Sequence, residues 1–124
     1  MMAYEKEGVT QIDVTELKQA LKDDETIVID IREHEEYVEA HIPGLPLIPM
    51  SEIVDVVDDF EKDKEYVLVC RSGRRSHETS KFFKMNGIEQ VKNYEGGMLA
   101  WDEDVQTGEE NIINNVKDLY KGGA

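Results

Sequence analysis

The chain has 124 residues, 40% hydrophobic and 34% charged, and its 28 acidic and 14 basic side chains give a net charge of −14. That length fits one domain with its own core, and the negative charge excludes nucleic acid and anionic membranes as expected partners. The single cysteine excludes an internal disulfide, and no Cys or His pair has metal-ligand spacing, so no metal is expected.

The N-terminal third alternates between strand and helix patterns. Residues 9–12 are expected to form a first strand, and Asp13 has the position of a helix N-cap with Glu16 three residues later. The apolar run 26–31 predicts a strand covered on both faces, and residues 33–40 predict a short helix. The first residues lack the apolar stretch of a signal peptide, so we expect a cytoplasmic protein in a reducing compartment.

The middle of the chain begins with a proline-rich connection. All three prolines lie in residues 41–49, which predicts a turn-rich segment with at most a short strand at residues 47–48. A helix is expected from Ser51 to about Phe60. Residues 66–70 then predict the central strand, and residues 76–86 predict a helix that ends at Gly87.

The last quarter contains one more strand, at residues 90–94, followed by a Gly96-Gly97 turn. Beyond Trp101 the pattern breaks, and residues 109–120 have apolar residues at helical spacing. We therefore expect a domain over residues 1–104 and an extension over residues 105–124. The extension is expected to form a short amphipathic helix, which docks on the domain or on a second copy, and a frayed end.

Chemistry is expected at Cys70, which ends the central strand. Arg71, Arg74 and Arg75 follow it closely, and a helix begins soon afterwards. Guanidinium groups, a helix N-terminus and inward-pointing N–H groups all stabilise a thiolate, which is the nucleophilic form of cysteine. Five basic residues within residues 71–85 face one acidic residue, which predicts a basic patch on an acidic body.

Other polar residues around Cys70 have simpler interpretations. Gly73 is expected to allow a tight backbone conformation that no side chain would permit. Ser76 is expected to cap the helix, although its hydroxyl and that of Ser72 are also candidates for contact with a sulfur ligand. His77 is expected to be an exposed first-turn residue, and His41 a structural one.

Several separated motifs carry a family resemblance: Asp30-Ile31-Arg32, His41-Ile42-Pro43-Gly44, the segment from Cys70 to Ser76, and Glu95-Gly96-Gly97 with Trp101. Over residues 9–104 the chain resembles a single-domain rhodanese, a thiosulfate sulfurtransferase. The resemblance implies an α/β, rhodanese-like fold, in which a five-stranded parallel sheet is flanked by helices on both faces. It also implies that Asp30 and Arg32 are framework residues beside the site.

By the same resemblance, Cys70 is the sulfur-accepting nucleophile, and the backbone N–H groups of residues 71–75 surround it. The expected donor is thiosulfate or a related sulfane sulfur compound, the acceptor is cyanide or a thiol, and no cofactor is needed. The expected substrate-binding residues are those that follow the nucleophile: Arg71, Ser72, Gly73, Arg74, Arg75 and Ser76.

Two other readings stay open. A phosphatase or arsenate reductase would use a similar loop. The phosphatases related to rhodanese in fold resemble one another in having an arginine six positions after the cysteine, where this chain has Ser76. The shorter loop, ending at Arg75, suits a single sulfur better than a tetrahedral phosphate. The second alternative is a sulfur carrier or a partner-binding module, and either a monomer or a weak homodimer fits the sequence.

Overall fold

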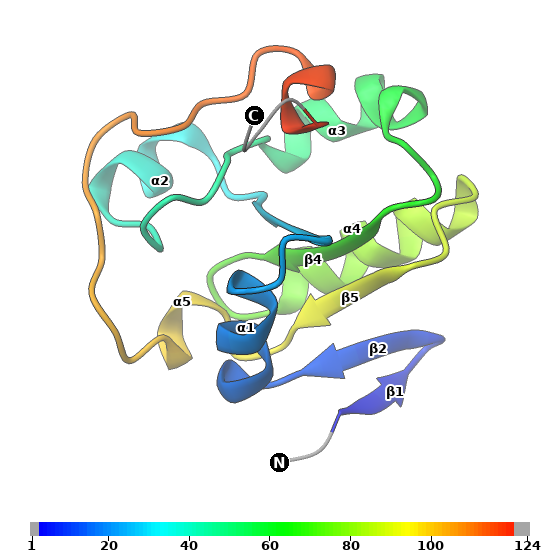
Figure 1. The fold of residues 1–124 in the computed structure, drawn as a ribbon, viewed down its shortest axis with the longest axis horizontal. Helices are drawn as coiled ribbons and strands as arrows, with labels where there is room; N and C mark the ends of the chain where they lie inside the picture. The colour runs from blue at the N-terminus through cyan, green and yellow to red at the C-terminus, as the bar shows by residue number, and fades with distance from the viewer. Residues whose placement is uncertain (1–2, 121–124) are drawn as a thin grey trace.

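The structure, a computed structural model, describes residues 3–120 and contains one five-stranded sheet (Figure 1). The strands are β1 (Tyr4–Lys6), β2 (Val9–Ile12), β3 (Thr26–Asp30), β4 (Glu65–Val69) and β5 (Val91–Tyr94). Their order across the sheet is β1-β2-β5-β4-β3, and β4 lies between two parallel neighbours. The predicted α/β fold with a five-stranded sheet is thus confirmed, but the sheet is only mostly parallel, because β1 pairs with β2 in the antiparallel direction.

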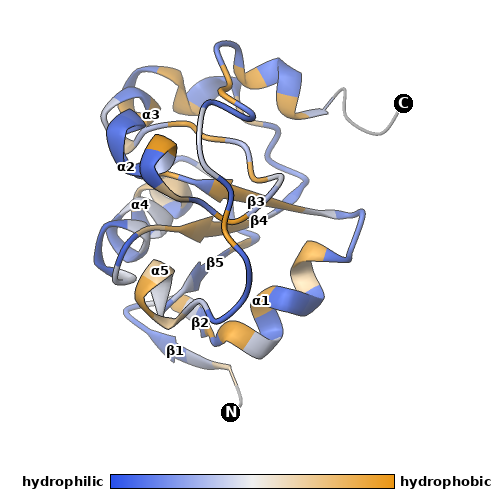
Figure 2. Ribbon diagram, turned by 90° about the vertical axis from the view of Figure 1, so that its left-hand side faces the viewer, coloured by the Kyte–Doolittle hydropathy of each residue, from blue (hydrophilic) through white to orange (hydrophobic). Residues whose placement is uncertain are grey.

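Helices cover both faces of this sheet. They are α1 (Val14–Leu21), α2 (His34–Glu39), α3 (Met50–Val56), α4 (Arg74–Met85) and α5 (Gly97–Ala100), with 3-10 helices at Val57–Asp59 and Val116–Tyr120. Side chains alternate along β4, so Tyr66 and Leu68 face α3 and α4, whereas Val67 faces α1. Two apolar cores result, and Figure 2 shows in orange the hydrophobic residues of β3 and β4 that contribute to both. Among residues 3–120, no helix has the length and apolar character that a membrane crossing requires.

Two predicted helix boundaries, the start of α1 and the end of α4, follow from local chemistry. Asp13 accepts a hydrogen bond from the Glu16 N–H at 2.9 Å, and the Glu16 carboxylate accepts one from the Asp13 N–H at 3.1 Å. This is the reciprocal cap predicted for α1. Gly87, with φ +87°, follows the end of α4 as predicted, in a conformation that other residues rarely adopt.

One strand was not predicted, and it is the antiparallel exception. Strand β1 pairs with β2 through a two-residue turn at Glu7 and Gly8, which have φ of +52° and +82°. Because all three β1 residues are exposed, and two of them are charged, the strand has no buried face for a sequence pattern to reveal. The short strand expected at residues 47–48 is reduced to two isolated bridges of Leu47, one with Asp30 and one with Ile112.

The extension does not form the expected helix over residues 109–120. The Leu47 N–H donates to the Asn111 carbonyl at 3.0 Å, and the Ile113 N–H donates to the Leu47 carbonyl at 3.1 Å. These backbone groups are therefore unavailable to a helix, and only Val116–Tyr120 forms a 3-10 turn. Ile113 and Val116 are buried in the core beside α3, so the extension docks on its own domain. The predicted frayed end, residues 122–124, lies outside the described residues.

Candidate active site

Cys70 directly follows β4, at the carboxyl end of the parallel strands, where α/β sheets bind their ligands. The alternation of β4 turns its side chain toward α4, and the residue is only 1% exposed. A buried cysteine is often an inert core residue, so its burial alone assigns no chemistry. The polar contacts of the sulfur distinguish this cysteine from an inert one.

Three hydrogen-bond donors converge on the Cys70 sulfur. The N–H groups of Gly73 and Ser76 lie 3.1 and 3.3 Å from Sγ, and the Ser76 hydroxyl lies 3.2 Å away. Helix α4 begins at Arg74, so its N-terminus also faces this loop. Three donors directed at one sulfur suit an anionic sulfur better than a neutral thiol. The donors to the sulfur are thus Gly73 and Ser76, and not the whole of residues 71–75.

Helix α5 holds the loop in this orientation from outside. The N–H groups of Met98 and Leu99 donate to the carbonyls of Cys70 and Arg71 at 2.9 and 3.1 Å. With these carbonyls bound on the outer side, the following N–H groups are free to point toward the sulfur. Gly97 allows this approach, because a Cβ at that position would lie 2.3 Å from the Arg71 carbonyl oxygen.

Gly73 has the backbone conformation predicted for it, with φ +86°. A Cβ there would lie 2.0 Å from the Glu95 carbonyl oxygen, and its close neighbours are all backbone atoms of Glu95. The excluded side chain would therefore collide with the Glu95 segment and not with the sulfur. Close packing of two loops, 70–73 and 95–97, is what requires glycine here.

The three arginines of the loop differ in their surroundings. Arg75 forms a two-pronged ion pair with Glu36 of α2, at 2.8 and 2.7 Å, and its hydrogen bonds are the main reason that the pKa of Glu36 falls to about 2. Arg71 and Arg74 are exposed, and within residues 3–120 their side chains form no ion pair or hydrogen bond. Lys81 pairs with Glu7 and Glu78. Two of the five basic residues of the predicted patch are therefore paired, and Arg71 and Arg74 remain as free cations at the rim.

Ser76 is not the helix cap that the sequence suggested. The helix begins two residues earlier than expected, with Gly73 at the N-cap, so Ser76 occupies the third helical position. Its hydroxyl is buried and lies against Sγ and against the side-chain oxygen of Asn93. Ser72 is exposed at the rim, and its hydroxyl forms no hydrogen bond with any described residue.

The prediction for His77 was also wrong. The ring is 5% exposed and lies between Gln11 and Glu7. His41 is structural as predicted: its ring stacks on Tyr37 with centroids 3.7 Å apart, and Nδ1 lies 2.8 Å from the Tyr37 carbonyl.

Sequence reasoning missed Gln11 and Asn93, although a signal for them existed. Each is a polar residue at an inward position of a strand, sharing a face with Val9 and Val91 respectively.

Asp30 and Arg32 form the framework that the resemblance implied. The Arg32 guanidinium donates to the Asp30 carboxylate at 2.9 Å and to the Ala40 carbonyl at 2.7 Å. Both side chains are buried, and Asp30 pairs with Val69, next to Cys70. The pair ties the end of β3 to the segment after α2, beside the candidate site.

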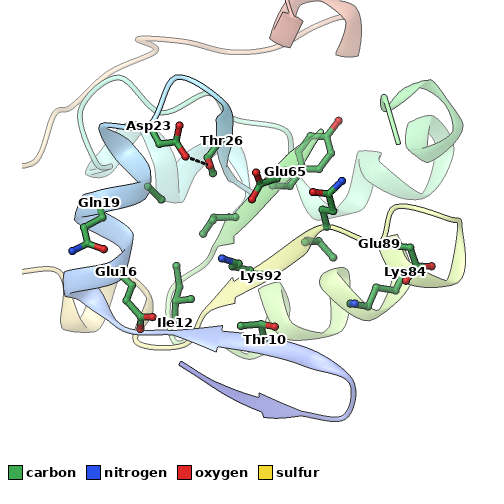
Figure 3. A pocket seen from close by; sticks show the side chains of 15 residues that line it. Thr10, Ile12, Glu16, Gln19, Asp23, Thr26, Glu65, Lys84, Glu89 and Lys92 are labelled. Carbon is green, nitrogen blue, oxygen red and sulfur yellow. Dashed lines mark hydrogen bonds between the residues drawn. The ribbon is translucent and has the colours of Figure 1, made fainter. Parts of the chain in front are cut away.

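A cleft outside this site lies at the other end of the sheet. It has a volume of about 440 Å³, and Figure 3 shows its side chains, among them Thr26 and Glu65 at the amino ends of β3 and β4. Its lining mixes acidic residues with Lys84 and Lys92 and includes no residue from 70–76. A smaller cleft of about 360 Å³ is lined by Ser72 and Arg74, on the side of the loop that faces β1 and β2.

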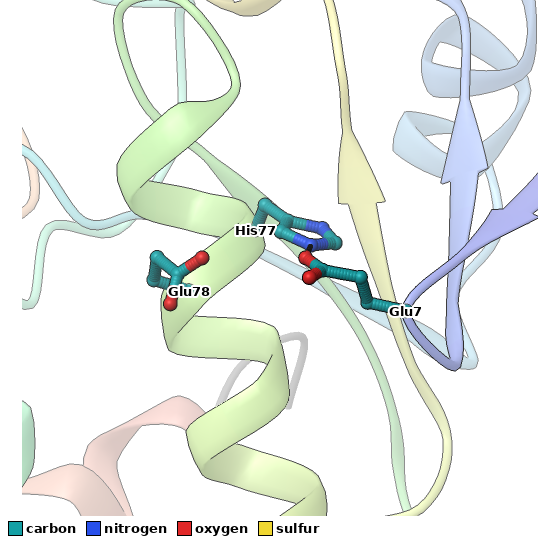
Figure 4. Close-up of side chains that lie close together, drawn as sticks. All are labelled: Glu7, His77 and Glu78. Carbon is teal, nitrogen blue, oxygen red and sulfur yellow. Dashed lines mark hydrogen bonds and ion pairs between the residues drawn. The ribbon is translucent and has the colours of Figure 1, made fainter.

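Glu7, His77 and Glu78 bring possible ligand atoms within 4.8 Å of one another (Figure 4). The Lys81 ammonium lies 3.4 Å from a carboxylate oxygen of Glu7 and 3.4 Å from one of Glu78. A cation is thus already present, and we interpret this cluster as an ion-pair network.

Comparison with known proteins gives consistent matches. The family model for the rhodanese-like domain matches residues 13–104. A Bacillus subtilis protein named "Putative sulfurtransferase YtwF" is 41% identical over 95 residues, covering 76% of this chain and 91% of that protein. "Putative sulfur carrier protein YrkF" of the same organism is 35% identical over 95 residues, covering 76% of this chain and 51% of its own length. The crystal structure of a rhodanese-like domain protein from Staphylococcus aureus superposes with a TM-score of 0.71 at 37% identity, over 80% of this chain and 98% of that one.

Proposed function

This chain belongs to the rhodanese-like domain family, and from that membership and the loop geometry we propose that it is a sulfurtransferase working through a persulfide on Cys70. The observation that carries the proposal is the convergence of the Gly73 N–H, the Ser76 N–H and the Ser76 hydroxyl on Sγ. These donors stabilise a negative sulfur, which is the attacking form in such a reaction. A reactive thiol of this kind needs a reducing compartment, which supports a cytoplasmic location.

The proposed first step uses thiosulfate or a related sulfane sulfur donor. The Cys70 thiolate attacks the outer sulfur, a new S–S bond forms, and the bond to the sulfonate sulfur breaks with its electron pair leaving on sulfite. An acceptor, cyanide or a thiol, then attacks the outer sulfur of the persulfide, and the electron pair of the broken bond returns to Sγ. No cofactor takes part, because both steps exchange one sulfur–sulfur bond for another bond to sulfur.

The rim cations have a defined part in this proposal. Arg71 and Arg74 are exposed and free of ion pairs within the described chain, so they are available to bind the sulfonate oxygens of a donor. Arg75 differs, since its guanidinium is held by Glu36. We propose that Arg75 contributes to the loop by fixing α4 against α2. Because Cys70 is 1% exposed, the donor has to reach the sulfur between these rim residues.

Intact-protein mass spectrometry tests the proposal directly. After incubation with thiosulfate, the protein is expected to gain one sulfur atom at Cys70, and cyanide is expected to remove it as thiocyanate. Cys70→Ser should gain none. Absence of sulfur gain in the unmodified chain would refute the proposal. Steady hydrolysis of an aryl phosphate that is lost in Cys70→Ser would favour phosphatase chemistry instead.

The role of the rim arginines is tested by steady-state kinetics with thiosulfate. Arg74→Ala is expected to raise KM for thiosulfate by about tenfold, the value of one hydrogen bond between charged groups. Lys84→Ala makes the same change in net charge, but Lys84 lines the distant cleft, and KM should stay the same. Equal changes in the two variants would show that only overall charge matters.

A sulfur carrier is the second candidate, and the likeness to "Putative sulfur carrier protein YrkF" is the observation that favours it. The persulfide is common to both functions, so sulfur gain does not separate them. Repeated turnover with a small thiol acceptor would identify an enzyme. A persulfide that persists with small thiols and is discharged only by a partner protein would identify a carrier.

A further inference from the structure

A continuous run of buried polar side chains lies beneath the Cys70 loop. It leads from the sulfur to the turn between β1 and β2, and its inner members are between 0% and 5% exposed. In order from the sulfur, these side chains are Ser76, Asn93, Gln11, His77 and Glu7. Of these five residues, only Ser76 belongs to the loop, and the loop residue Gly73 contacts the run through its backbone carbonyl.

Backbone carbonyls fix the direction of the two amides. The Asn93 side-chain nitrogen donates to the Gly73 carbonyl at 3.0 Å and to the Gln11 side-chain oxygen at 2.7 Å. The Gln11 nitrogen in turn lies 3.1 Å from the Val9 carbonyl. A carbonyl can only accept, so each of these contacts requires a nitrogen. The oxygen of Asn93 therefore has to face Ser76.

The outer end of the run supports the same orientation. The Gln11 nitrogen lies 3.0 Å from Nδ1 of His77, which thus acts as an acceptor, and Nε2 of His77 donates to Glu7 at 2.7 Å. Figure 4 shows Glu7 reaching the His77 ring from the hairpin turn. The hairpin formed by β1 and β2 thereby holds Gln11, and through it Asn93.

This arrangement leaves one hydrogen with two acceptors. The Ser76 hydroxyl has a single hydrogen, and both Sγ of Cys70 and the amide oxygen of Asn93 are within hydrogen-bond distance of its oxygen. A thiolate is a charged acceptor and attracts the hydrogen more strongly than an amide oxygen. In a persulfide the charge lies on the outer sulfur, and Sγ, bonded to carbon and sulfur, becomes a weak acceptor.

We propose that Asn93 is a positioning residue for sulfur transfer: its amide oxygen receives the Ser76 hydrogen when charge leaves Sγ, and releases it when the sulfur is discharged. The inference rests on the proposed function, because it requires a persulfide. Only the acceptor of the hydrogen changes during the cycle, and no proton enters or leaves the protein. The loop is thus able to stabilise both charge states without moving its backbone.

A double-mutant cycle with two readouts tests this inference. The first readout is the alkylation rate of Cys70 by iodoacetamide as a function of pH. The second is the fraction of persulfide at a fixed ratio of thiosulfate to sulfite. Asn93→Ala removes the competing acceptor, so the midpoint of alkylation should move to lower pH while the persulfide fraction falls severalfold. A general loss of structure would not favour the thiolate and disfavour the persulfide together.

Both effects should disappear when Ser76→Ala is already present, because the hydroxyl transmits them. Asn86→Ala removes a partly buried asparagine at the far end of α4 and should change neither readout. If Asn93→Ala does not fold, Asn93→Asp replaces it. Its carboxylate holds the hydrogen and adds negative charge, so the midpoint should move to higher pH, and by less in the Ser76→Ala background.

Equal effects of the Asn93 variant with and without the Ser76 hydroxyl would overturn the inference. Its failure is distinguishable from failure of the proposed function. If the unmodified chain takes up sulfur but the two substitutions act independently, only this inference fails. If the unmodified chain takes up no sulfur, the proposed function fails and this inference fails with it.

Discussion

Replacing Gly73 with alanine tests the close packing that shapes the site. A Cβ at Gly73 would lie 2.0 Å from the Glu95 carbonyl oxygen, 1.0 Å inside the 3.0 Å that real Cβ contacts respect. The three nearest atoms are all backbone atoms of Glu95, so one loop has to move. That movement would weaken the hydrogen bonds from the Gly73 N–H to Sγ and from Asn93 to the Gly73 carbonyl.

The expected loss of unfolding free energy in Gly73→Ala has two parts. A left-handed φ costs a non-glycine residue about 1–2 kcal/mol, and two weakened hydrogen bonds add about 1 kcal/mol each. Gly108→Ala isolates the first part, because Gly108 has φ +88° and nothing within 4 Å of its Cβ position. We therefore expect Gly73→Ala to lower the free energy of unfolding by about 2 kcal/mol more than Gly108→Ala.

Urea denaturation followed by circular dichroism measures this difference. In thermal unfolding of the same variants, the gap of about 2 kcal/mol should appear as a Tm lower by roughly 6–12 °C in Gly73→Ala than in Gly108→Ala. Sulfur uptake from thiosulfate should also be reduced in Gly73→Ala alone. If the two variants were equally stable, the contact between the two loops would not be the reason for glycine at position 73.

Two further predictions concern an ion pair and the extension. The pKa of Glu36 is lowered from 4.5 to about 2, chiefly by hydrogen bonds from Arg75, so the pair stabilises the fold above pH 4.5 and this contribution is lost as pH falls toward 2. Glu36→Gln should therefore reduce the free energy of unfolding at neutral pH by about 1 kcal/mol, allowing for the partial exposure of the pair. The free energies of unfolding of Glu36→Gln and of the unmodified chain should approach each other in acid, and a difference that does not shrink there would contradict this. Ile113→Ala should lower the free energy of unfolding by about 2–4 kcal/mol in the same assay, since its side chain is buried against the core, whereas a loss below about 0.5 kcal/mol would mean that the extension is not part of it.

The parallel strands and most helices could be predicted because their residues carry the information locally. The Asp13 and Glu16 cap, the apolar run of β3 and the left-handed Gly87 each depend on neighbours in the sequence. The place of Cys70 after β4 and the left-handed backbone of Gly73 could be predicted for the same reason, because the loop and its flanking strand are contiguous.

Features that depend on distant contacts could not be predicted. Arg75 resembled the other loop arginines until the structure placed Glu36 beside it, 39 positions away in the sequence. His77 resembled an exposed helical residue because the hairpin that covers it comes from the other end of the chain. The extension had helical spacing, but pairing with Leu47 gave its backbone other partners.

The pairing of the extension with Leu47 has a consequence for how the molecule avoids self-association. An open sheet edge is a template for strands of other molecules, and natural proteins shield or shorten such edges. Beyond β3, residues 111–113 shield Leu47, whereas at the opposite border β1 is only three residues long and two of them are charged. A chain cut after residue 104 would uncover both the backbone of Leu47 and the apolar surface beneath Val116, and it should aggregate.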